Sequence, residues 1–403
     1  MKQRSDYTFK YNKNLGRHGW LRLTPAYSVK LVSEILQLNN SKLKSPNILD
    51  PFSGTATTGI VAAELGFNCT LYDINPFLVW FGKTKGRNYD LLDLNKMLES
   101  IKNDLPKIDF KKGNCWIPPM RNIERWWSDN TQNTLASIRN YLSTKWGEPN
   151  DSDSYNLLWV GFARLCIECS AADFNHISVS FKESISEFNA NAIVQMFFDI
   201  IENIFESASI PISGSVNILN MDSRLLEYEE KYDIVVTSPP YPNRISYIRE
   251  LRPYMYWLKF LSSGEEAGEL DWKAIGGTWG IATSRLTTWE QTNADLPQEL
   301  LDVYEKITVG DPKNGILMAQ YVKKFFDDLY IHLGNLRQRL NKGARLYYIL
   351  GNSSFYGNYV RTDVLTQEIL TKLGYSKVDS VIIRKRNSKS HLYEYMISAT
   401  WNG

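Results

Sequence analysis

Cysteine is scarce in this chain, and so are the features of a secreted or membrane-bound protein. Four cysteines among 403 residues are too few for the disulfide framework of a small secreted domain. The N-terminal segment has no apolar core of a signal peptide, and no apolar run reaches the roughly 18 residues needed to span a membrane. We therefore expect a cytoplasmic protein with reduced thiols and no membrane partner.

A strong charge of one sign is also missing. The chain has 46 basic and 44 acidic residues, which leaves a net charge of +2. A nucleic-acid partner would have to meet a local basic surface, because the protein has no general excess of positive charge. Hydrophobic residues make up 43% of the chain, so we expect a folded globular protein with room for one large domain carrying insertions, or for two domains.

Metal-ligating patterns are weak. Cys166 and Cys169 form a C-x-x-C pattern on a predicted helix, but no second cysteine pair or histidine cluster lies nearby in the sequence. A structural zinc site needs four such ligands. A buried apolar pair is the better interpretation, and we expect that the protein requires no metal ion.

Seven apolar runs predict strands that alternate with helical patterns, as in an α/β fold. Apolar residues at helical spacing predict helices at 25–38, 57–65, 319–340 and 362–374. A strand, a small-residue loop, a helix and a second strand open the series, which is typical of a Rossmann-like sheet. We expect the sheet to be mostly parallel with an antiparallel terminal hairpin. The predicted strands are 47–52, 68–75, 215–222, 232–238, 344–351, 378–385 and 393–401.

Two stretches interrupt this pattern. Residues 85–212 are mostly helical, and we interpret them as a helical insertion with helices at 91–101, 123–142, 156–165 and 192–205. Residues 242–315 contain glycine-rich and serine-rich segments, so we expect a loop-rich region. The remaining segments, 1–84 and 213–403, are predicted to form one α/β domain.

Chemically distinctive residues follow the first three strands. The segment DPFSGTATTG (50–59) is a loop of small residues that opens a helix, so backbone amides and the helix N-terminus can approach a ligand. Asp73 ends the second strand, where a carboxylate can accept hydrogen bonds from a ribose diol, and Asp222 ends the third, where it could meet an adenine amine. The carboxyl ends of parallel strands meet at one edge of such a sheet, where ligands bind.

Other ligand classes fit this loop less well. The segment 50–59 contains neither the G-x-G-x-x-G of dinucleotide-binding proteins nor the Gly-Lys-Ser/Thr of a Walker loop. Taken alone, a small-residue loop is often only a turn, and an aspartate that ends a strand often only caps a helix.

The segment TSPPY (237–241) directly follows the apolar run DIVV. Two consecutive prolines stiffen the turn and leave a backbone carbonyl with no competing amide from the next residue. Ser238 adds a hydroxyl and Tyr241 a flat aromatic face, so the segment can accept hydrogen bonds from an amino group and stack on an extruded base. The alternative is a rigid turn in which Tyr241 only packs.

In these motifs the chain resembles the amino-methyltransferases of DNA, the N6-adenine and N4-cytosine family associated with restriction–modification. RLTPAYSVKLV (22–32) resembles the segment before the family's cofactor loop, DPFSGTATTG the loop itself, YDINP (72–76) its acidic ribose contact and TSPPY its catalytic loop. The resemblance covers about 22–80 and 215–400. It implies a methyltransferase catalytic domain formed by 1–84 and 213–403, which acts on double-stranded DNA by base flipping.

The resemblance also implies a residue for each role. The catalytic residues would be Ser238, Pro239, Pro240 and Tyr241. The absence of any Pro-Cys dipeptide argues against the other DNA chemistry, C5-cytosine methylation through a covalent thiolate. The cofactor, S-adenosyl-L-methionine, would be held by Thr24, Pro25, Tyr27, Ser28, Asp50, Pro51, Phe52, Ser53, Gly54, Thr55, Asp73, Ile74 and Asp222.

A serine before Pro-Pro-Tyr is typical of the N4-cytosine members of the family. The resemblance therefore predicts a site-specific N4-cytosine methyltransferase of a restriction–modification system, with a restriction endonuclease of the same site as a further partner. Three alternatives stay open: N6-adenine methylation of DNA, methylation of a guanine amine in RNA, and a nucleic-acid-binding protein without catalysis.

Two features depart from the family pattern. Ala56 stands where the cofactor loop usually has its second glycine. Only 15 positions separate Asp222 from Thr237, so the target-recognition region has to come from 85–210, from 242–315 or from both. We expect 242–315 to contact the bases, since arginine reads guanine and aromatic rings stack. The candidate DNA-binding residues are Asn243, Arg244, Arg249, Arg252 and Arg285.

Overall fold

The computed structural model of the protein describes most of the chain, and every structural statement below concerns the part described. No helix in these residues is long and apolar enough to cross a membrane. The described residues are 4–21, 27–40, 45–110, 115–150, 153–173, 180–183, 185, 187–225, 229–277, 281–293, 295–386 and 391–403.

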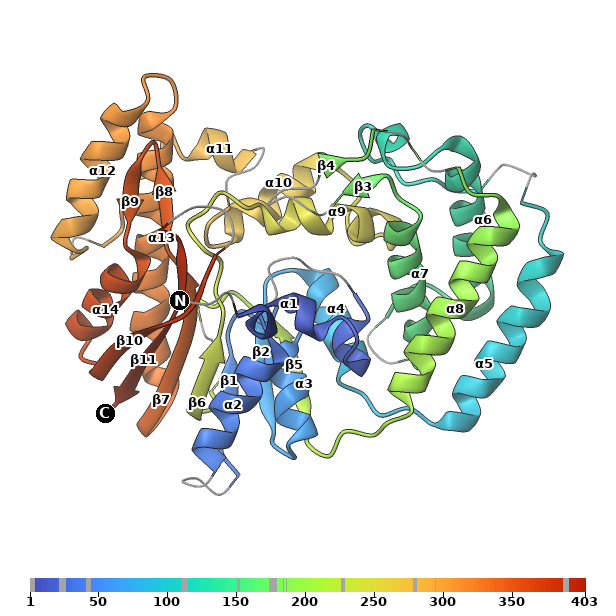
Figure 1. Ribbon diagram of the computed structural model, residues 1–403, viewed down its shortest axis with the longest axis horizontal. Coiled ribbons are helices and arrows are strands. Elements are labelled where there is room, and N and C mark those ends of the chain that lie inside the picture. The colour runs from blue at the N-terminus through green and yellow to red at the C-terminus, as the bar shows by residue number, and fades with distance from the viewer. Residues whose placement is uncertain are drawn as a thin grey trace.

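A seven-stranded mixed sheet organises one end of the molecule (Figure 1). Its order is β10-β11-β7-β6-β1-β2-β5, in which β5, β2, β1, β6 and β7 are parallel neighbours and β11 pairs antiparallel with both β7 and β10. The seven predicted strands and the antiparallel terminal hairpin are thus confirmed. The strands are β1 Ile48–Asp50, β2 Cys69–Asp73, β5 Val216–Asn220, β6 Tyr232–Thr237, β7 Leu340–Gly351, β10 Ser376–Lys385 and β11 Tyr393–Trp401.

Successive residues of the central strands face two different hydrophobic clusters, because side chains alternate across a sheet. Ile48 and Ile234, which are register partners, pack with the helices α2 (Val29–Asn40) and α3 (Thr57–Glu64). The neighbouring Leu49 and Val235 pack on the other face with α12 (Gln298–Gly310), α13 (Gly315–Leu336) and α14 (Thr362–Lys372). Both faces are therefore covered, which explains why these strands read as continuous apolar runs.

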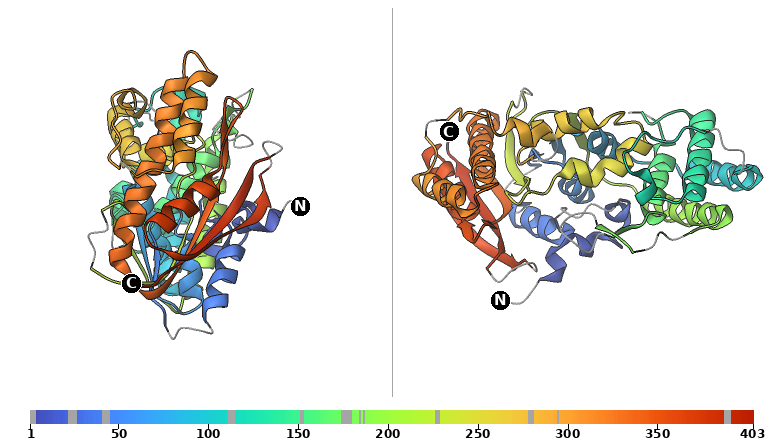
Figure 2. Two further views of the ribbon diagram at one scale, coloured as in Figure 1. Left: turned by 90° about the vertical axis from the view of Figure 1, so that its left-hand side faces the viewer. Right: turned by 90° about the horizontal axis from the view of Figure 1, so that it is seen from above.

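The helical stretch forms a bundle at the opposite end of the molecule from the C-terminal strands, as Figure 1 and the right-hand view of Figure 2 show. Its core contains the buried Trp126, Trp127 and Trp159 and extends onto α4 (Pro76–Lys85) and α9 (Tyr247–Trp257). Cys166 and Cys169 are buried in this bundle as free thiols. The bundle helices are α5 Leu91–Asp104, α6 Asp129–Trp146, α7 Asn156–Glu168 and α8 Ala190–Ala208.

The region 242–315 is more helical than the expected loop-rich segment, since it contains α9, α10 (Gly264–Lys273), α11 (Ile281–Arg285) and α12. The run SSGEEAGE looks like a loop because of its serines and glycines, but it starts α10. Ser263 accepts a hydrogen bond from the Glu266 amide, while the Glu266 carboxylate accepts hydrogen bonds from the amide and hydroxyl of Ser262. This reciprocal capping offsets the low helix propensity of the segment.

The N-terminal segment joins α4, which follows β2 of the sheet, to α8 of the helical bundle. The Arg17 guanidinium is buried and donates hydrogen bonds to the carbonyls of Lys85, Ala208 and Ile210, at the ends of α4 and α8. Arg17 therefore supports packing and does not reach the pocket described below. The remaining short elements are η1 Ser5–Tyr7, α1 Phe9–Asn12, η2 Gly16–Gly19, η3 Leu105–Lys107, η4 Ile123–Arg125, β3 Ala172–Asp173, β4 Ser180–Phe181, η5 Arg337–Arg339, β8 Ser353–Phe355 and β9 Asn358–Val360.

Candidate active site

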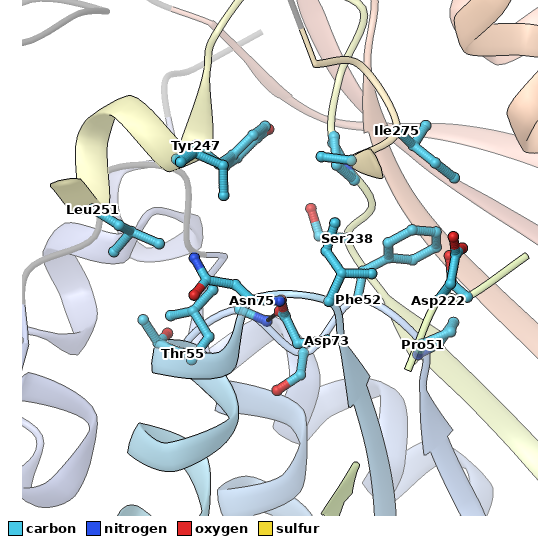
Figure 3. A pocket seen from close by; sticks show the side chains of 18 of the residues that line it. Pro51, Phe52, Thr55, Asp73, Asn75, Asp222, Ser238, Tyr247, Leu251 and Ile275 are labelled. Atoms are coloured by element: carbon cyan, nitrogen blue, oxygen red, sulfur yellow. Dashed lines mark hydrogen bonds between the residues drawn. The ribbon is translucent and has the colours of Figure 1, made fainter. Parts of the chain in front are cut away.

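A pocket lies at the carboxyl ends of the parallel strands, where β1, β2, β5 and β6 pass into loops (Figure 3). Figure 3 shows Tyr247 and Leu251 of α9 on one side of this space and Thr55 and Asp73 on the other. The lining residues are Tyr27, Pro51, Phe52, Ser53, Gly54, Thr55, Thr57, Asp73, Ile74, Asn75, Leu78, Met221, Asp222, Ser223, Ser238, Pro240, Tyr247, Ile248, Leu251, Lys273, Ala274 and Ile275.

Asp50, the last residue of β1, lies beneath the pocket and does not line it. Its fully buried carboxylate accepts hydrogen bonds from the hydroxyls of Thr58 (2.6 Å), Thr237 (2.5 Å) and Tyr27 (3.2 Å) and from the Phe52 amide (3.0 Å). Burial raises the pKa of Asp50, and the hydrogen bonds oppose this rise. Asp50 thereby ties the N-terminal segment, its own loop and the end of β6 together.

The loop after β1 turns through two left-handed residues. Gly54 has a φ of 50° and Ala56 a φ of 59°. Ala56 therefore adopts the backbone conformation that glycine favours, at the cost of steric strain for a residue with a Cβ. Ala56 thus replaces the usual glycine of the family pattern but retains a left-handed backbone conformation that glycine can adopt.

Asp73, the last residue of β2, stands in the wall of the pocket. Its carboxylate accepts hydrogen bonds from the Gly54 amide and from the Asn75 amide, each at 2.9 Å. Burial raises the pKa of Asp73 to about 7, although the two backbone hydrogen bonds act in the opposite direction. A ligand that donates hydrogen bonds to this carboxylate would favour its ionised form.

Two further features of the loop point to a ligand in the pocket. The hydroxyl oxygen of Ser53 is buried in the pocket wall and has no hydrogen-bond partner among the described residues. A buried polar atom without a partner is costly, and a ligand would relieve this cost. Behind the loop, the ammonium group of the buried Lys85 donates a hydrogen bond of 2.8 Å to the Thr55 carbonyl.

Asp222 lines the pocket after β5, and its carboxylate is bound by an arginine. Arg224 donates to both carboxylate oxygens of Asp222, at 3.0 Å and 2.7 Å, and to Asp328 at 2.8 Å. Burial would raise the pKa of Asp222, but the hydrogen bonds and charge of Arg224 lower it overall. Arg224 also donates to the Lys273 carbonyl, so it connects this wall to the C-terminal end of α10.

The TSPPY segment contributes Ser238 and Pro240 to the pocket, whereas Pro239 and Tyr241 do not line it. The Ser238 hydroxyl donates a hydrogen bond of 3.2 Å to the Ile349 carbonyl of β7 and lies 3.4 Å from the Tyr241 hydroxyl. Tyr241 is therefore adjacent to the pocket through Ser238. Its ring packs against Gly351 at the end of β7.

The wall formed by α9 and by residues 273–275 was missed by the sequence analysis. Tyr247, Ile248 and Leu251 share one side of α9, whose first turn is capped by the Ser246 hydroxyl. Their helical spacing directly after TSPPY was the available signal. Lys273 ends α10 and residues 274–275 follow it, and these residues carried no comparable signal in the sequence.

The other predicted residues take varied positions. Ser28 is buried and donates to the Asp6 carbonyl at 2.6 Å, away from the pocket lining. None of the five predicted DNA-binding residues lines the pocket. Arg244 and Arg249 are exposed, Asn243 and Arg252 are half-buried, and Arg285 is paired with Glu269 at 2.9 Å. Thr24 and Pro25 lie outside the described residues.

The described residues offer no evident set of ligands for a metal ion. Among the described residues, no group of three or more histidine, cysteine, aspartate or glutamate side chains is arranged to hold a metal ion. The polar residues that line the pocket include serines, threonines, Asn75, Lys273 and two aspartates, Asp73 at the end of β2 and Asp222 shortly after β5.

Comparison with known proteins points to methyltransferases. No family model matches the chain. The chain is 24% identical over 441 residues to the type II methyltransferase M.BsoBI of Geobacillus stearothermophilus, which covers 96% of this chain and 84% of that protein. It is 22% identical to the type II methyltransferase M.AvaI of Nostoc sp. (strain PCC 7120), with 93% and 82% covered, and 19% identical to M.MvaI of Kocuria varians, with 90% and 84% covered.

A solved structure was also found, of the rRNA methyltransferase aviRa from Streptomyces viridochromogenes. Its sequence identity is 11% and its TM-score 0.29, with 93% of this chain and 86% of that chain covered, and at this score the likeness carries no argument. The sequence relatives support the resemblance seen in the motifs at a coarser level: over nearly its whole length, this α/β chain is a distant homologue of type II methyltransferases.

Proposed function

We propose that the protein transfers a methyl group from S-adenosyl-L-methionine to the N4 amine of a flipped cytosine in double-stranded DNA. One observation carries the proposal: Ser238 and Pro240 of the TSPPY segment line the same pocket as Gly54 and Asp73. A catalytic loop and a nucleotide-type binding loop that share a pocket can bring a base amine to a methyl donor. In this proposal 1–84 and 213–403 form the catalytic domain, and 85–212 is an insertion.

The residues of the pocket fit the proposed cofactor. The Asp73 carboxylate is suited to accept hydrogen bonds from a ribose diol, as acidic residues at the second strand of nucleotide-binding sheets do. The partnerless Ser53 hydroxyl and the small-residue loop offer polar contacts for the methionine part. Apolar side chains such as Ile74 and Leu251 can enclose the adenine ring, with Asp222 at its edge.

The catalytic segment can orient the amine and accept its hydrogen bonds. The cofactor supplies an electrophilic methyl group on a sulfonium centre. The Ser238 hydroxyl donates to Ile349, so its oxygen lone pairs remain available to accept a hydrogen bond from the amine. Such acceptors keep the nitrogen lone pair directed at the methyl carbon. The nitrogen–carbon bond forms as the carbon–sulfur bond breaks, and the amine then loses one proton to solvent.

The choice of cytosine depends on Ser238. A serine before Pro-Pro-Tyr is typical of N4-cytosine members of the family that the chain resembles, and the distant relatives do not distinguish the base. N6-adenine methylation uses the same kind of loop and is the principal alternative. Both chemistries need the base outside the helix, because the amine is otherwise paired.

The proposed DNA surface is the region 242–315 beside the pocket. Arg244 and Arg249 are exposed near the start of α9, the helix whose opposite side lines the pocket. Arg285 is less available, because Glu269 already pairs with it. We therefore assign phosphate or base contacts first to Arg244 and Arg249. As a member of a restriction–modification system, the protein would have a restriction endonuclease of the same site as its companion enzyme.

Product identification tests the proposal. Purified protein is incubated with tritiated cofactor and with duplex DNA or tRNA from cells that lack methyltransferases, and labelled DNA is digested to nucleosides. We expect N4-methyl-2′-deoxycytidine, and much less label from an Asp73→Ala preparation made in parallel at the same limiting cofactor concentration. If the product is N6-methyl-2′-deoxyadenosine, the target base is adenine and not cytosine. If only tRNA is labelled, the substrate is RNA and not DNA. If the protein does not bind the cofactor, it is not a methyltransferase.

A further inference from the structure

A polar site lies beside Tyr241, which neighbours Ser238 but does not line the pocket. We call it the Tyr241 site and define it as Tyr241, Gly351, Asn352 and Arg386. A Cβ added at Gly351 would come within 2.8 Å of the Tyr241 ring and 3.0 Å of Nη1 of Arg386. Both side chains therefore contact the end of β7 closely, and only glycine leaves room for them.

Arg386 is fixed from two directions. Its Nη1 donates a hydrogen bond of 2.7 Å to the Asn352 carbonyl, and its own amide donates to the Leu392 carbonyl at 2.8 Å, where the β10–β11 hairpin closes. Asn352 is fully buried, donates to the Tyr359 hydroxyl at 2.7 Å and accepts from the Tyr393 amide at 2.9 Å. The guanidinium thus has a rigid support, as a recognition residue needs.

The donors of Arg386 are not consumed by the nearby carboxylate. Glu394 is buried, and its two carboxylate oxygens accept hydrogen bonds from Nε and Nη2 of Arg384. Within the described residues, Nε and Nη2 of Arg386 have no hydrogen-bond acceptor. The guanidinium carbon lies over the Tyr241 ring, 5.6 Å from its centroid. Donor groups are therefore held at the aromatic face where a flipped base is expected.

We propose that Arg386 is a specificity-determining residue that donates hydrogen bonds to N3 and O2 of the flipped cytosine. The inference rests on the proposed function. A cytosine on Tyr241 with its amine at Ser238 has two adjacent acceptors left on the same edge, and a guanidinium fork matches two adjacent acceptors. Adenine in the same position presents one acceptor, N1, beside a C2–H group. Arg386 would therefore favour cytosine over adenine.

The test uses variants of the full-length protein with Arg386 and its neighbour Lys385. Arg386→Met removes the donors and keeps the apolar stem, Arg386→Lys keeps the charge without the fork, and Lys385→Met controls for loss of one nearby charge. The substrates are duplexes with the mapped target cytosine, or with adenine in its place. The readouts are kcat and KM for each duplex, cofactor affinity by calorimetry, and DNA affinity at several salt concentrations.

We expect Arg386→Met to lower kcat/KM on the cytosine duplex by about 100-fold and to change the rate on the adenine duplex little, so that discrimination collapses. Arg386→Lys should be intermediate, Lys385→Met should stay within about threefold of the parent, and cofactor affinity should be unchanged. Equal losses on both duplexes would overturn the inference as a structural effect. Unchanged rates would overturn it directly.

Two other outcomes are separable. Weaker DNA binding with a smaller salt dependence, and an unchanged rate for bound DNA, would assign Arg386 to a phosphate and overturn base recognition. A parent protein that makes N6-methyladenine or leaves DNA unmodified would reject the proposed function before any variant is made, and Arg386 with it. A parent that makes N4-methylcytosine with an unaffected Arg386→Met variant rejects only the role of Arg386.

Discussion

The ends of β1 and β2 carry the same side chain in opposite roles. Asp50 is fully buried under the pocket and accepts hydrogen bonds from four groups on three chain segments. Asp73 stands in the pocket wall, and its two recorded hydrogen bonds come from backbone amides of the adjoining loops. The first aspartate organises the site, whereas the second can offer its carboxylate to a ligand. A strand-ending acid is therefore not evidence of ligand contact by itself.

The largest expected effect comes from Asp50→Ala. The change leaves the hydroxyls of Thr58 and Thr237 and the Phe52 amide without their buried acceptor, so we expect the free energy of unfolding to fall by about 3–5 kcal/mol. Urea unfolding followed by circular dichroism measures this loss. If Asp50→Ala is as stable as the parent protein but does not bind the cofactor, then Asp50 contacts the cofactor, and the contrast between a structural Asp50 and a ligand-binding Asp73 is wrong.

Asp73→Ala should have the reverse profile. We expect cofactor affinity to fall by about 30- to 100-fold, since charge-assisted hydrogen bonds contribute roughly 1.5–3 kcal/mol, and unfolding free energy to change by less than about 1 kcal/mol. Isothermal calorimetry with S-adenosylmethionine and with its demethylated product measures the affinity, and urea unfolding provides the control. Undiminished affinity would mean that the ribose lies elsewhere.

Tyr241→Ala is expected to impair binding of the target base and to leave binding of the cofactor unchanged. Loss of the stacking surface should lower kcat on DNA by about tenfold to a hundredfold, because stacking of a base on an aromatic ring contributes roughly 1–3 kcal/mol. Cofactor affinity should stay within about twofold, since Tyr241 does not line the pocket. Tyr241→Phe serves as the matched control and should retain most of the rate. A large loss of cofactor affinity in Tyr241→Ala would mean that the ring contacts the cofactor and would contradict its assignment to the base.

The smallest expected effect is a dependence of cofactor affinity on pH. The pKa of Asp73 is raised to about 7 in the free protein, so about one tenth of the carboxylate is ionised at pH 6 and about nine tenths at pH 8. If the ionised form accepts the ribose hydrogen bonds, affinity should rise about tenfold across this range and level off above it. Calorimetry of Asp73→Asn provides the control, because it retains any titration of the cofactor itself. Parallel curves for parent and variant would contradict the assignment.

Much of the fold follows from patterns that are local in the sequence. The seven strands were predicted from short apolar or β-rich runs, and the central ones are apolar because both faces of the sheet are covered there. The region 242–315 was less well predicted, because glycines and serines that indicate loops also cap helices, as Ser263 does. The direction of a side chain at a strand end could not be predicted, because it depends on partners such as Thr237 that are distant in the chain.

The sequence by itself determined the succession of strands along the chain, the small-residue loop after β1, the acidic ends of β1 and β2 and the presence of TSPPY after β6. Only the tertiary structure decided that Asp50 faces inward, that α9 closes the pocket, and that Arg386 meets Tyr241 across Gly351. The physical reason is that propensity and periodicity act between neighbours in the chain. Burial and hydrogen-bond pairing depend instead on which segments the fold brings together.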